Sequence, residues 1–262
     1  MVQRGGVNGT DGAAGVGRPT VWDRPEPPSR PAPSPLSRER IVAAAVELAD
    51  ADGLEAVSLR KVAAALDAGP MRLYRYLSTK EELLDLMVDA VHGEIAAATD
   101  PADPGDPDGR GGDWRAELRG CAHRTRRAAL RHPWFADLLG GRPQLGPNAL
   151  GNLETALAAL YGAPGFTGID AVLRAVRTVD DYLVGALRRE TAERRAERAT
   201  GLDKDAWRRS AGPHLSRTVA TGNYPALAAA VRYGTHTDPG TAFEAGLDLV
   251  LDGIAAGLAP PG

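Results

Sequence analysis

Residues 38–91 read RERIVAAAVELADADGLEAVSLRKVAAALDAGPMRLYRYLSTKEELLDLMVDAV. Within this stretch, successive segments have apolar residues at helical spacing, which places those side chains on one face of each helix. Ser37, Ser58 and Thr79 stand where they can each cap a helix start. Pro70 suits a first helical position because its missing N–H would be unpaired there. We therefore expect helices over residues 38–52, 59–66, 70–77 and 80–98.

The second and third of these predicted helices are short, and residues 67–69 form a turn between them. Two short helices joined by such a turn are the minimal helix-turn-helix, whose second helix lies in a DNA major groove. Residues 60–80 contain five basic side chains and one acidic one. This local excess of positive charge fits a DNA-binding surface, and equally an ordinary solvated helix face.

Downstream, the helical pattern continues and no segment alternates apolar and polar residues as a strand would. A loop over residues 100–112, with three Pro, four Gly and four Asp, separates two halves of the chain. The sequence therefore predicts an all-α protein. Further helices are expected over residues 113–131, 134–139, 148–160, 167–190 or 167–199, 203–220 and 239–258.

The overall composition excludes several classes of protein. The 262 residues are 43% hydrophobic and 25% charged, which is typical of a globular chain. A net charge of -3 provides no general attraction to nucleic acid, so any such contact must be local. With one cysteine, Cys121, and no Cys/His cluster of zinc-site spacing, we expect no disulfide, metal or cofactor. Without a membrane span or a signal peptide core, we expect a cytoplasmic protein that makes no membrane contact.

Residues 1–36 contain seven Pro and six Gly and only isolated apolar residues. Such a composition cannot build a core of its own, so we expect a disordered N-terminal tail. The alternative is an arm that enters a DNA groove, for which Arg18, Arg24 and Arg30 would provide the charge.

Residues 38–91 resemble the DNA-binding segment of the TetR family of transcriptional regulators. The resemblance is carried by SLRKVA at 58–63 and by LYRYLSTKEEL at 73–83. HPW at 132–134 and FEAGLDLVLDG at 243–253 resemble the C-terminal domain of the tetracycline-repressor type. The chain departs from the family pattern where it has Asp67, Ala68 and Arg72 in place of Gly, Val and Thr or Ser, and Leu77 in place of Phe. The operator sequence of a relative therefore does not transfer to this chain.

The resemblance implies a helix-turn-helix DNA-binding domain over residues 37–82 and a larger helical effector-binding and dimerisation domain over residues 83–262. It also implies that the start of the third helix approaches base edges while Lys80 contacts phosphate. Arg72 can present two donors to guanine, whereas Leu73 and Leu77 should face a small core; Tyr76 suits either place. The predicted DNA contacts are Ser58, Arg60, Lys61, Gly69, Pro70, Met71, Arg72, Tyr74, Arg75, Tyr76 and Lys80.

A single helix-turn-helix makes few contacts, so such modules bind two half-sites as dimers. Two apolar stripes can either pair across a two-fold axis into a four-helix bundle or form intramolecular core. The predicted interface residues are Ile169, Val172, Leu173, Val176, Leu183, Leu187, Phe243, Leu247, Val250, Leu251 and Ile254. The family usually binds a small molecule within its C-terminal half, and core packing is the alternative for each candidate residue. These candidates are Trp114, Leu118, Cys121, Thr125, Trp134, Phe135, Asp181 and Tyr182.

The function predicted from these features is a ligand-responsive transcriptional regulator of the repressor type. It would bind palindromic double-stranded operator DNA as a homodimer and be released by a small-molecule effector. The alternatives are control by a protein partner, activation in place of repression, and a small helical enzyme. For the enzyme, Cys121 with His123 or His132 would have to supply a nucleophile and a base, and no neighbouring residue activates the thiol.

Overall fold

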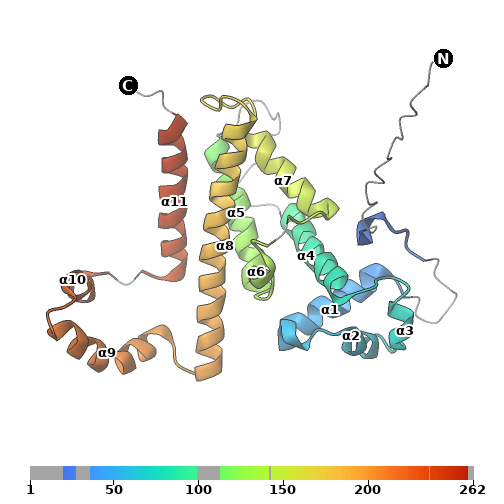
Figure 1. The fold of residues 1–262 in the computed structure, drawn as a ribbon, viewed down its shortest axis with the longest axis horizontal. Helices are drawn as coiled ribbons and strands as arrows, with labels where there is room; N and C mark the ends of the chain where they lie inside the picture. The colour runs from blue at the N-terminus through green and yellow to red at the C-terminus, as the bar shows by residue number, and fades with distance from the viewer. Residues whose placement is uncertain (1–19, 28–35, 99–112, 142, 236, 259–262) are drawn as a thin grey trace, which may run out of the picture.

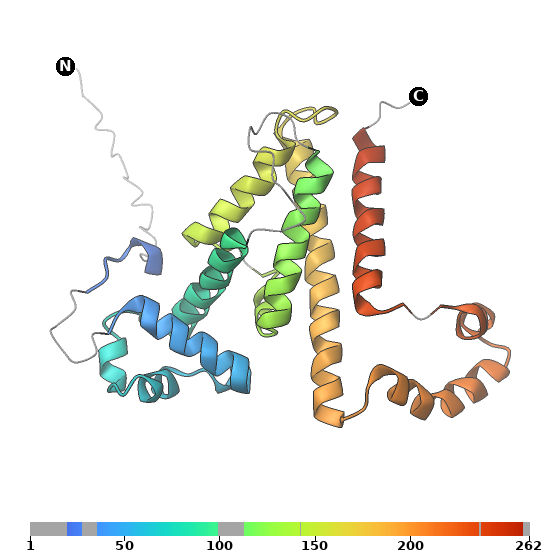
Figure 2. The same ribbon diagram turned by 180° about the vertical axis from the view of Figure 1, so that it is seen from behind.

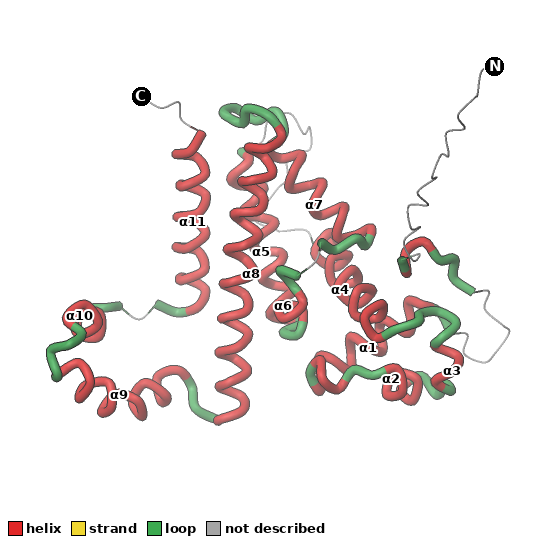
Figure 3. Tube along the Cα trace, in the orientation of Figure 1, coloured by secondary structure: helices red, strands yellow, loops and turns green. Residues whose placement is uncertain are grey.

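The computed structural model describes residues 20–27, 36–98, 113–141, 143–235 and 237–258. Across these residues the chain forms helices and connecting segments and no strand (Figure 3), so the predicted all-α class is confirmed. The α-helices are α1 (Arg38–Asp52), α2 (Leu59–Ala65), α3 (Pro70–Leu73), α4 (Lys80–Ala97), α5 (Trp114–Arg131), α6 (Phe135–Leu138), α7 (Pro147–Leu160), α8 (Ile169–Thr200), α9 (Lys204–Ala220), α10 (Pro225–Tyr233) and α11 (Pro239–Leu258). Two short 3-10 helices are η1 (Val21–Asp23) and η2 (Leu54–Ala56).

The helices form a small N-terminal cluster, a larger body and a projecting arm. Helices α1, α2 and α3 lie together at one end, and α4 runs from them into the body (Figure 1). In the body, α4 packs against α7 and α5, and α8 packs against α5 and α11. Helices α9 and α10 pack on each other and reach away from the body in both views (Figures 1 and 2).

The N-terminal cluster has the caps and the core that its sequence indicates. The hydroxyl oxygens of Ser37, Ser58 and Thr79 each accept a backbone N–H from three residues further on, at 3.2 to 3.3 Å. These bonds satisfy donors that a helix start leaves unpaired. Leu73 and Leu77 are fully buried, together with Val57 and Val62.

Helices α3 and α10 differ from the prediction, whereas α8 matches one of its two predicted extents. Helix α3 ends at Leu73 instead of residue 77, because the chain tightens into a turn in which the Tyr76 N–H bonds the Leu73 carbonyl at 2.8 Å. Helix α8 takes the longer of these extents and ends at Thr200; Gly201, which follows it, has a φ of 68°, the left-handed conformation that glycine adopts readily. Helix α10 was not predicted at all, although Pro225 stands at its start.

The expectation of a disordered tail over residues 1–36 is wrong for its described part. Val21 is only 2% exposed and Leu36 is also buried, both as members of the main core. The residues of this segment form no core among themselves, as expected, but they pack onto helices that other parts of the chain provide. Residues 1–19 and 28–35 lie outside the described residues.

A buried carboxylate joins α4 to the body. Asp89 on α4 is 5% exposed and accepts the backbone N–H groups of Asn148 and Ala149 at 3.0 and 2.9 Å. It thereby caps the start of α7 from a neighbouring helix, and the Asn148 amide adds a third bond to its carboxylate at 3.0 Å. Gly146 is required beside it, because a Cβ there would lie 2.1 Å from a carboxylate oxygen of Asp89.

Protonation of His92 should destabilise the fold. Burial lowers the pKa of this imidazole, although Asp89 nearby opposes the shift. Its Nδ1 lies 3.2 Å from Asn152 Nδ2, so it accepts a hydrogen bond in the neutral ring. The unfolded chain takes up the proton first, so the contribution of His92 to stability is complete above about pH 6.5 and is lost as the pH falls through the lowered pKa.

The measurement is urea unfolding of the wild type and of His92→Asn at about pH 7.5 and 5.5, on either side of the ordinary imidazole pKa. Asparagine keeps an acceptor near the Nδ1 position and does not titrate. We expect the variant to lose less stability than the wild type between the two pH values. An equal loss in both proteins would contradict the assignment to His92.

Candidate nucleic-acid interface

The side chains predicted to contact DNA lie on one surface of the N-terminal cluster. They come from the start and outer face of α2, from α3 and the turn after it, and from the first residue of α4. Met71 is 78% exposed, the highest fraction among the exposed large apolar side chains of the described residues. The exposed members are Arg60, Lys61, Gly69, Pro70, Met71, Arg72, Tyr74 and Arg75, and Ser58 and Lys80 are partly buried.

Tyr76 is the exception, and its assignment as a DNA contact is wrong. The side chain is 7% exposed, and its hydroxyl donates a hydrogen bond to the Leu36 carbonyl at 2.7 Å. The ring is therefore buried, and the hydroxyl group already has a hydrogen-bond partner within the protein. The tightened turn after α3 is what carries Tyr76 inward, and helical periodicity could not have shown that.

The basic side chains of this surface differ from those of the body. Within the described residues, none of Arg60, Lys61, Arg72, Arg75 and Lys80 belongs to an ion pair. In the body, by contrast, arginines such as Arg119 and Arg126 pair with carboxylates on other helices. A protein of net negative charge thus keeps a group of available cations on its helix-turn-helix, which is the distribution that phosphate binding needs.

A polar cluster connects α1 to the body near the start of α6. Both carboxylate oxygens of Asp50, near the end of α1, lie 2.9 Å from His132 Nδ1, and Trp134 Nε1 donates to Asp50 at 2.7 Å. On its other side, His132 Nε2 lies 3.2 Å from a carboxylate oxygen of Glu94 on α4. His132 and Trp134 are both buried. The helix-turn-helix therefore has a direct polar contact with the body in addition to its covalent link through α4.

Several of the residues predicted to bind an effector lie instead in the core, in the polar cluster or on the surface. Trp134 belongs to the polar cluster just described, and Phe135 is fully buried with its ring 5.4 Å from that of His92. Asp181 is exposed and lies 4.0 Å from Arg177 on its own helix, so within this chain it is not enclosed in a pocket. Leu118 is buried core, whereas Trp114, Cys121, Thr125 and Tyr182 are partly buried.

The charged contacts between α5, α8 and α11 were not predicted from the sequence. The Arg126 guanidinium donates two hydrogen bonds to buried Glu190, at 2.9 and 2.8 Å, and lies over the Phe243 ring. These bonds raise the pKa of Arg126 further, in spite of its partial burial. Glu190 continues the apolar stripe of Leu183 and Leu187 by one turn, and a charged residue in that position is the signal that could have revealed the pair.

The predicted dimer stripes are largely intramolecular. Val172, Leu183 and Leu187 on α8 are buried within the chain itself, and so are Phe243, Leu247 and Leu251 on α11. For these six residues the alternative of internal core is correct, because α8 and α11 of the same chain pack on each other. Ile169 and Leu173 remain exposed, and Val176, Val250 and Ile254 are partly buried.

A cationic helix-turn-helix carried on a larger helical body defines a DNA-binding regulatory protein. Residues 41–87 match the family described as bacterial regulatory proteins, tetR family, and residues 106–258 match the tetracyclin repressor-like C-terminal domain. The chain belongs to the TetR family of transcriptional regulators. The predicted family and the predicted class of function, a helix-turn-helix transcriptional regulator, are thereby confirmed.

Individual relatives agree over almost the whole chain. The HTH-type transcriptional repressor DrrR1 of Streptomyces coeruleorubidus is 40% identical over 256 residues, which are 96% of this chain and 90% of the relative. An HTH-type transcriptional regulator of Saccharopolyspora erythraea is 36% identical over 99% of this chain and 98% of its own length. The structure of ActR of Streptomyces coelicolor with actinorhodin is similar with a TM-score of 0.69 and 25% identity, covering 86% of this chain and all of ActR.

Neither a membrane-spanning helix nor a metal-binding cluster is found in the described part of the chain. No helix there has the length and apolar character required to cross a membrane. Within the same residues, no three or more His, Cys, Asp or Glu side chains gather in a way that could hold a metal ion.

Proposed function

We propose that this protein represses transcription by binding a palindromic operator as a homodimer, and that a small-molecule effector releases it. The proposal rests above all on the group of available cations around α2 and α3. In a protein of net negative charge, a local group of cations that belong to no ion pair among the described residues is the charge distribution that favours binding of a polyanion such as DNA. Activation in place of repression is the alternative that the reporter experiment below distinguishes, and control by a protein partner is the alternative to a small-molecule effector.

The proposed contacts divide into base reading and positioning. We call residues 37–82 the reading head. Arg72 on α3 can donate two hydrogen bonds to the O6 and N7 atoms of guanine, and exposed Met71 beside it can contact a thymine methyl group. Tyr74 and Lys80 would instead bind phosphate groups and fix the position of the reading head without reading sequence.

The homodimer is supported by apolar surface that this chain leaves uncovered. Leu249 on α11 is 75% exposed, and Ile169 and Leu173 on α8 are exposed as well. Helices α9 and α10 contain no buried residue, although Trp207 and Tyr233 give them apolar surface. A second copy that covers the outer face of α8 and α11 would form a four-helix bundle and give the arm a surface to pack on.

The effector is proposed to be a small, mainly apolar molecule. The crystal structure of ActR in complex with actinorhodin is an example of a related fold with a small molecule bound to it. In this chain, the proposed effector contacts are the partly buried Trp114, Cys121 and Thr125 on α5 and Tyr182 on α8. Aromatic walls with few polar groups are suited to such a ligand.

Selection of bound duplexes from a random DNA pool tests the proposal. The purified protein should enrich a palindrome, and a binding isotherm should show two chains per site. A reporter gene placed behind the recovered site should be silenced by the protein if it is a repressor and induced if it is an activator. If no sequence is enriched, even after small molecules have been removed by refolding, the proposal fails.

The dimer surface has its own prediction. Leu249→Arg places a charge in the centre of the proposed bundle, so we expect monomers in sedimentation velocity. Operator affinity should fall by about 100-fold or more, because the second reading head no longer binds at a high effective concentration. Leu150→Arg on α7, where leucine is also exposed, is the matched control and should leave both properties unchanged. If Leu249→Arg is still dimeric, the interface lies elsewhere.

A further inference from the structure

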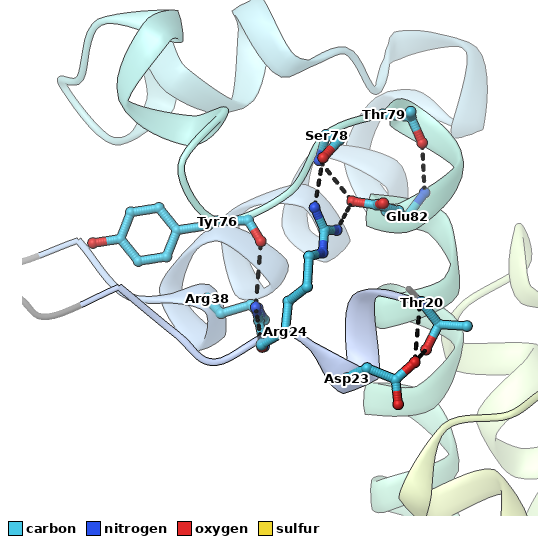
Figure 4. Close-up of polar contacts among 8 residues, drawn as sticks. All are labelled: Thr20, Asp23, Arg24, Arg38, Tyr76, Ser78, Thr79 and Glu82. Carbon is cyan, nitrogen blue, oxygen red and sulfur yellow. Dashed lines mark hydrogen bonds and ion pairs between the residues drawn. The ribbon is translucent and has the colours of Figure 1, made fainter. Parts of the chain in front are cut away.

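The described part of the N-terminal region forms a compact element, which we call the N-terminal strap (Thr20–Pro27). Its first residues close a short turn: the Thr20 backbone N–H and hydroxyl donate to the Asp23 carboxylate at 3.0 and 2.7 Å. These bonds lower the pKa of Asp23 and keep the carboxylate ionised. The strap precedes both segments that match the family models. Figure 4 shows it lying across the start of α4.

Arg24 anchors the strap to the junction between the helix-turn-helix and α4. One guanidinium nitrogen donates to the Ser78 hydroxyl at 2.6 Å, and the other pairs with the carboxylate of Glu82 (Figure 4). Glu82 also accepts the Ser78 backbone N–H at 2.6 Å and donates its own N–H to the Thr79 hydroxyl at 3.2 Å. Arg24 therefore binds the residues that determine where and in which direction α4 begins.

A second set of bonds connects the strap to α1 and to the turn after α3. The Arg38 guanidinium donates to the Arg24 carbonyl at 3.1 Å and to the Tyr76 carbonyl at 3.4 Å. The backbone N–H of Arg38 donates to the Glu26 carboxylate at 2.7 Å. The strap thus contacts α1 and the residues at the start of α4 directly, and Arg38 joins it to the turn that follows α3.

The other end of the strap faces the body. Buried Val21 and partly buried Trp22 line a cavity of about 420 Å³ together with Leu84 and Val88 on α4. The opposite wall of this cavity is formed by body residues around the connection from α6 to α7, namely Leu138, Pro143, Gln144 and Leu145. The strap lies between the reading head and the body as a further link, beside α4 and the contact of Asp50 with His132 and Trp134.

We propose that the N-terminal strap holds the reading head at a fixed angle to the body, with Arg24 as the positioning residue. This inference rests on the proposed function, because the angle matters for two reading heads that must meet half-sites on one face of DNA. Without the strap, each reading head would turn more freely about the start of α4. The reading head would then lose this rotational freedom only when it binds DNA. The entropy lost at that step lowers operator affinity.

Spin-label distance measurements test the positioning role without DNA. Labels at Glu47→Cys on α1 and Glu154→Cys on α7, both exposed, report the distance between head and body in a Cys121→Ser background. Labelled chains are diluted with unlabelled protein so that each distance is measured within one chain. We expect a narrow distribution that broadens in Arg24→Ala. Arg60→Ala, which removes an exposed arginine of the reading head that belongs to no ion pair among the described residues, should leave the distribution narrow.

Operator binding is the second measurement. Arg24→Ala should weaken binding about fivefold or more, a typical size for coupling between sites, and should leave the salt dependence unchanged. In a Glu82→Gln background the same substitution should have a much smaller effect, since Arg24 acts through Glu82. Weaker binding with a flatter salt dependence and no broadening would make Arg24 a phosphate contact and overturn the proposal. No change in either measurement would also overturn it. If the distribution broadens but the wild type selects no operator, the strap is supported and the proposed function fails.

Discussion

Replacing Arg72 with alanine is expected to weaken operator binding by about 2 to 6 kcal/mol, because each of two reading heads loses a bidentate contact worth about 1 to 3 kcal/mol. The loss should be confined to sites that carry the preferred base pair. At one position of each half-site, the variant should bind all four base pairs with similar affinity. The measurement compares the dissociation constants of wild type and variant on the selected operator and on its single-base variants.

Lys80→Ala is the matched comparison for this prediction. Lys80 is the first residue of α4 and is proposed to bind phosphate, so its loss should weaken binding to every sequence alike. The slope of log affinity against log salt should become shallower by about two, one for each reading head. If both variants weaken binding to every sequence equally, Arg72 does not read a base and α3 is placed differently on the DNA.

Asp89→Ala should cause the largest loss of stability, about 3 kcal/mol. The substitution leaves the first N–H groups of α7 and the Asn148 amide without their buried acceptor, and it opens a space beside Gly146. Because Asp89 joins α4 to α7, the effect should extend to the whole body. Denaturant unfolding at a fixed protein concentration measures this loss.

The control for Asp89→Ala is Asp85→Ala, one turn earlier on the same helix and exposed. Both changes remove one negative charge and introduce the same residue, so general effects of charge and helix propensity cancel. We expect the control to unfold within about 0.5 kcal/mol of the wild type, as exposed positions usually do. Similar losses in both variants would mean that the capping bonds of Asp89 contribute nothing.

The starts of α1, α2 and α4 were predictable because their signals are local. A hydroxyl residue followed by helical periodicity specifies a cap within a few residues, and all three caps form bonds of the expected kind. The end of α3 was not predictable in this way. The chain tightens there into a turn that buries Tyr76, and the hydrogen-bond partner of the Tyr76 hydroxyl, the Leu36 carbonyl, is 40 residues earlier in the chain.

The apolar stripes of α8 and α11 show a second limit. Periodicity identifies a face that must be buried, but it does not say whether the same chain or another one covers it. Here the regular stripe, with Leu187 and Leu247, is covered within the chain, while Leu249 lies outside it. The contact of Asp50 with His132 was equally inaccessible, because residues 82 positions apart leave no joint pattern in a single sequence.

Val21 gives the N-terminal region a practical importance. A shortened chain that begins at residue 37 would keep every helix of the reading head, and composition alone would recommend it. It would also lose both buried apolar residues of that region, Val21 and Leu36, and would leave the surface of α4 around Leu84 and Val88 open to water. We expect such a protein to aggregate more readily and to be less soluble than the 262-residue chain, so purification and crystallisation should use a chain that includes Val21 and Leu36.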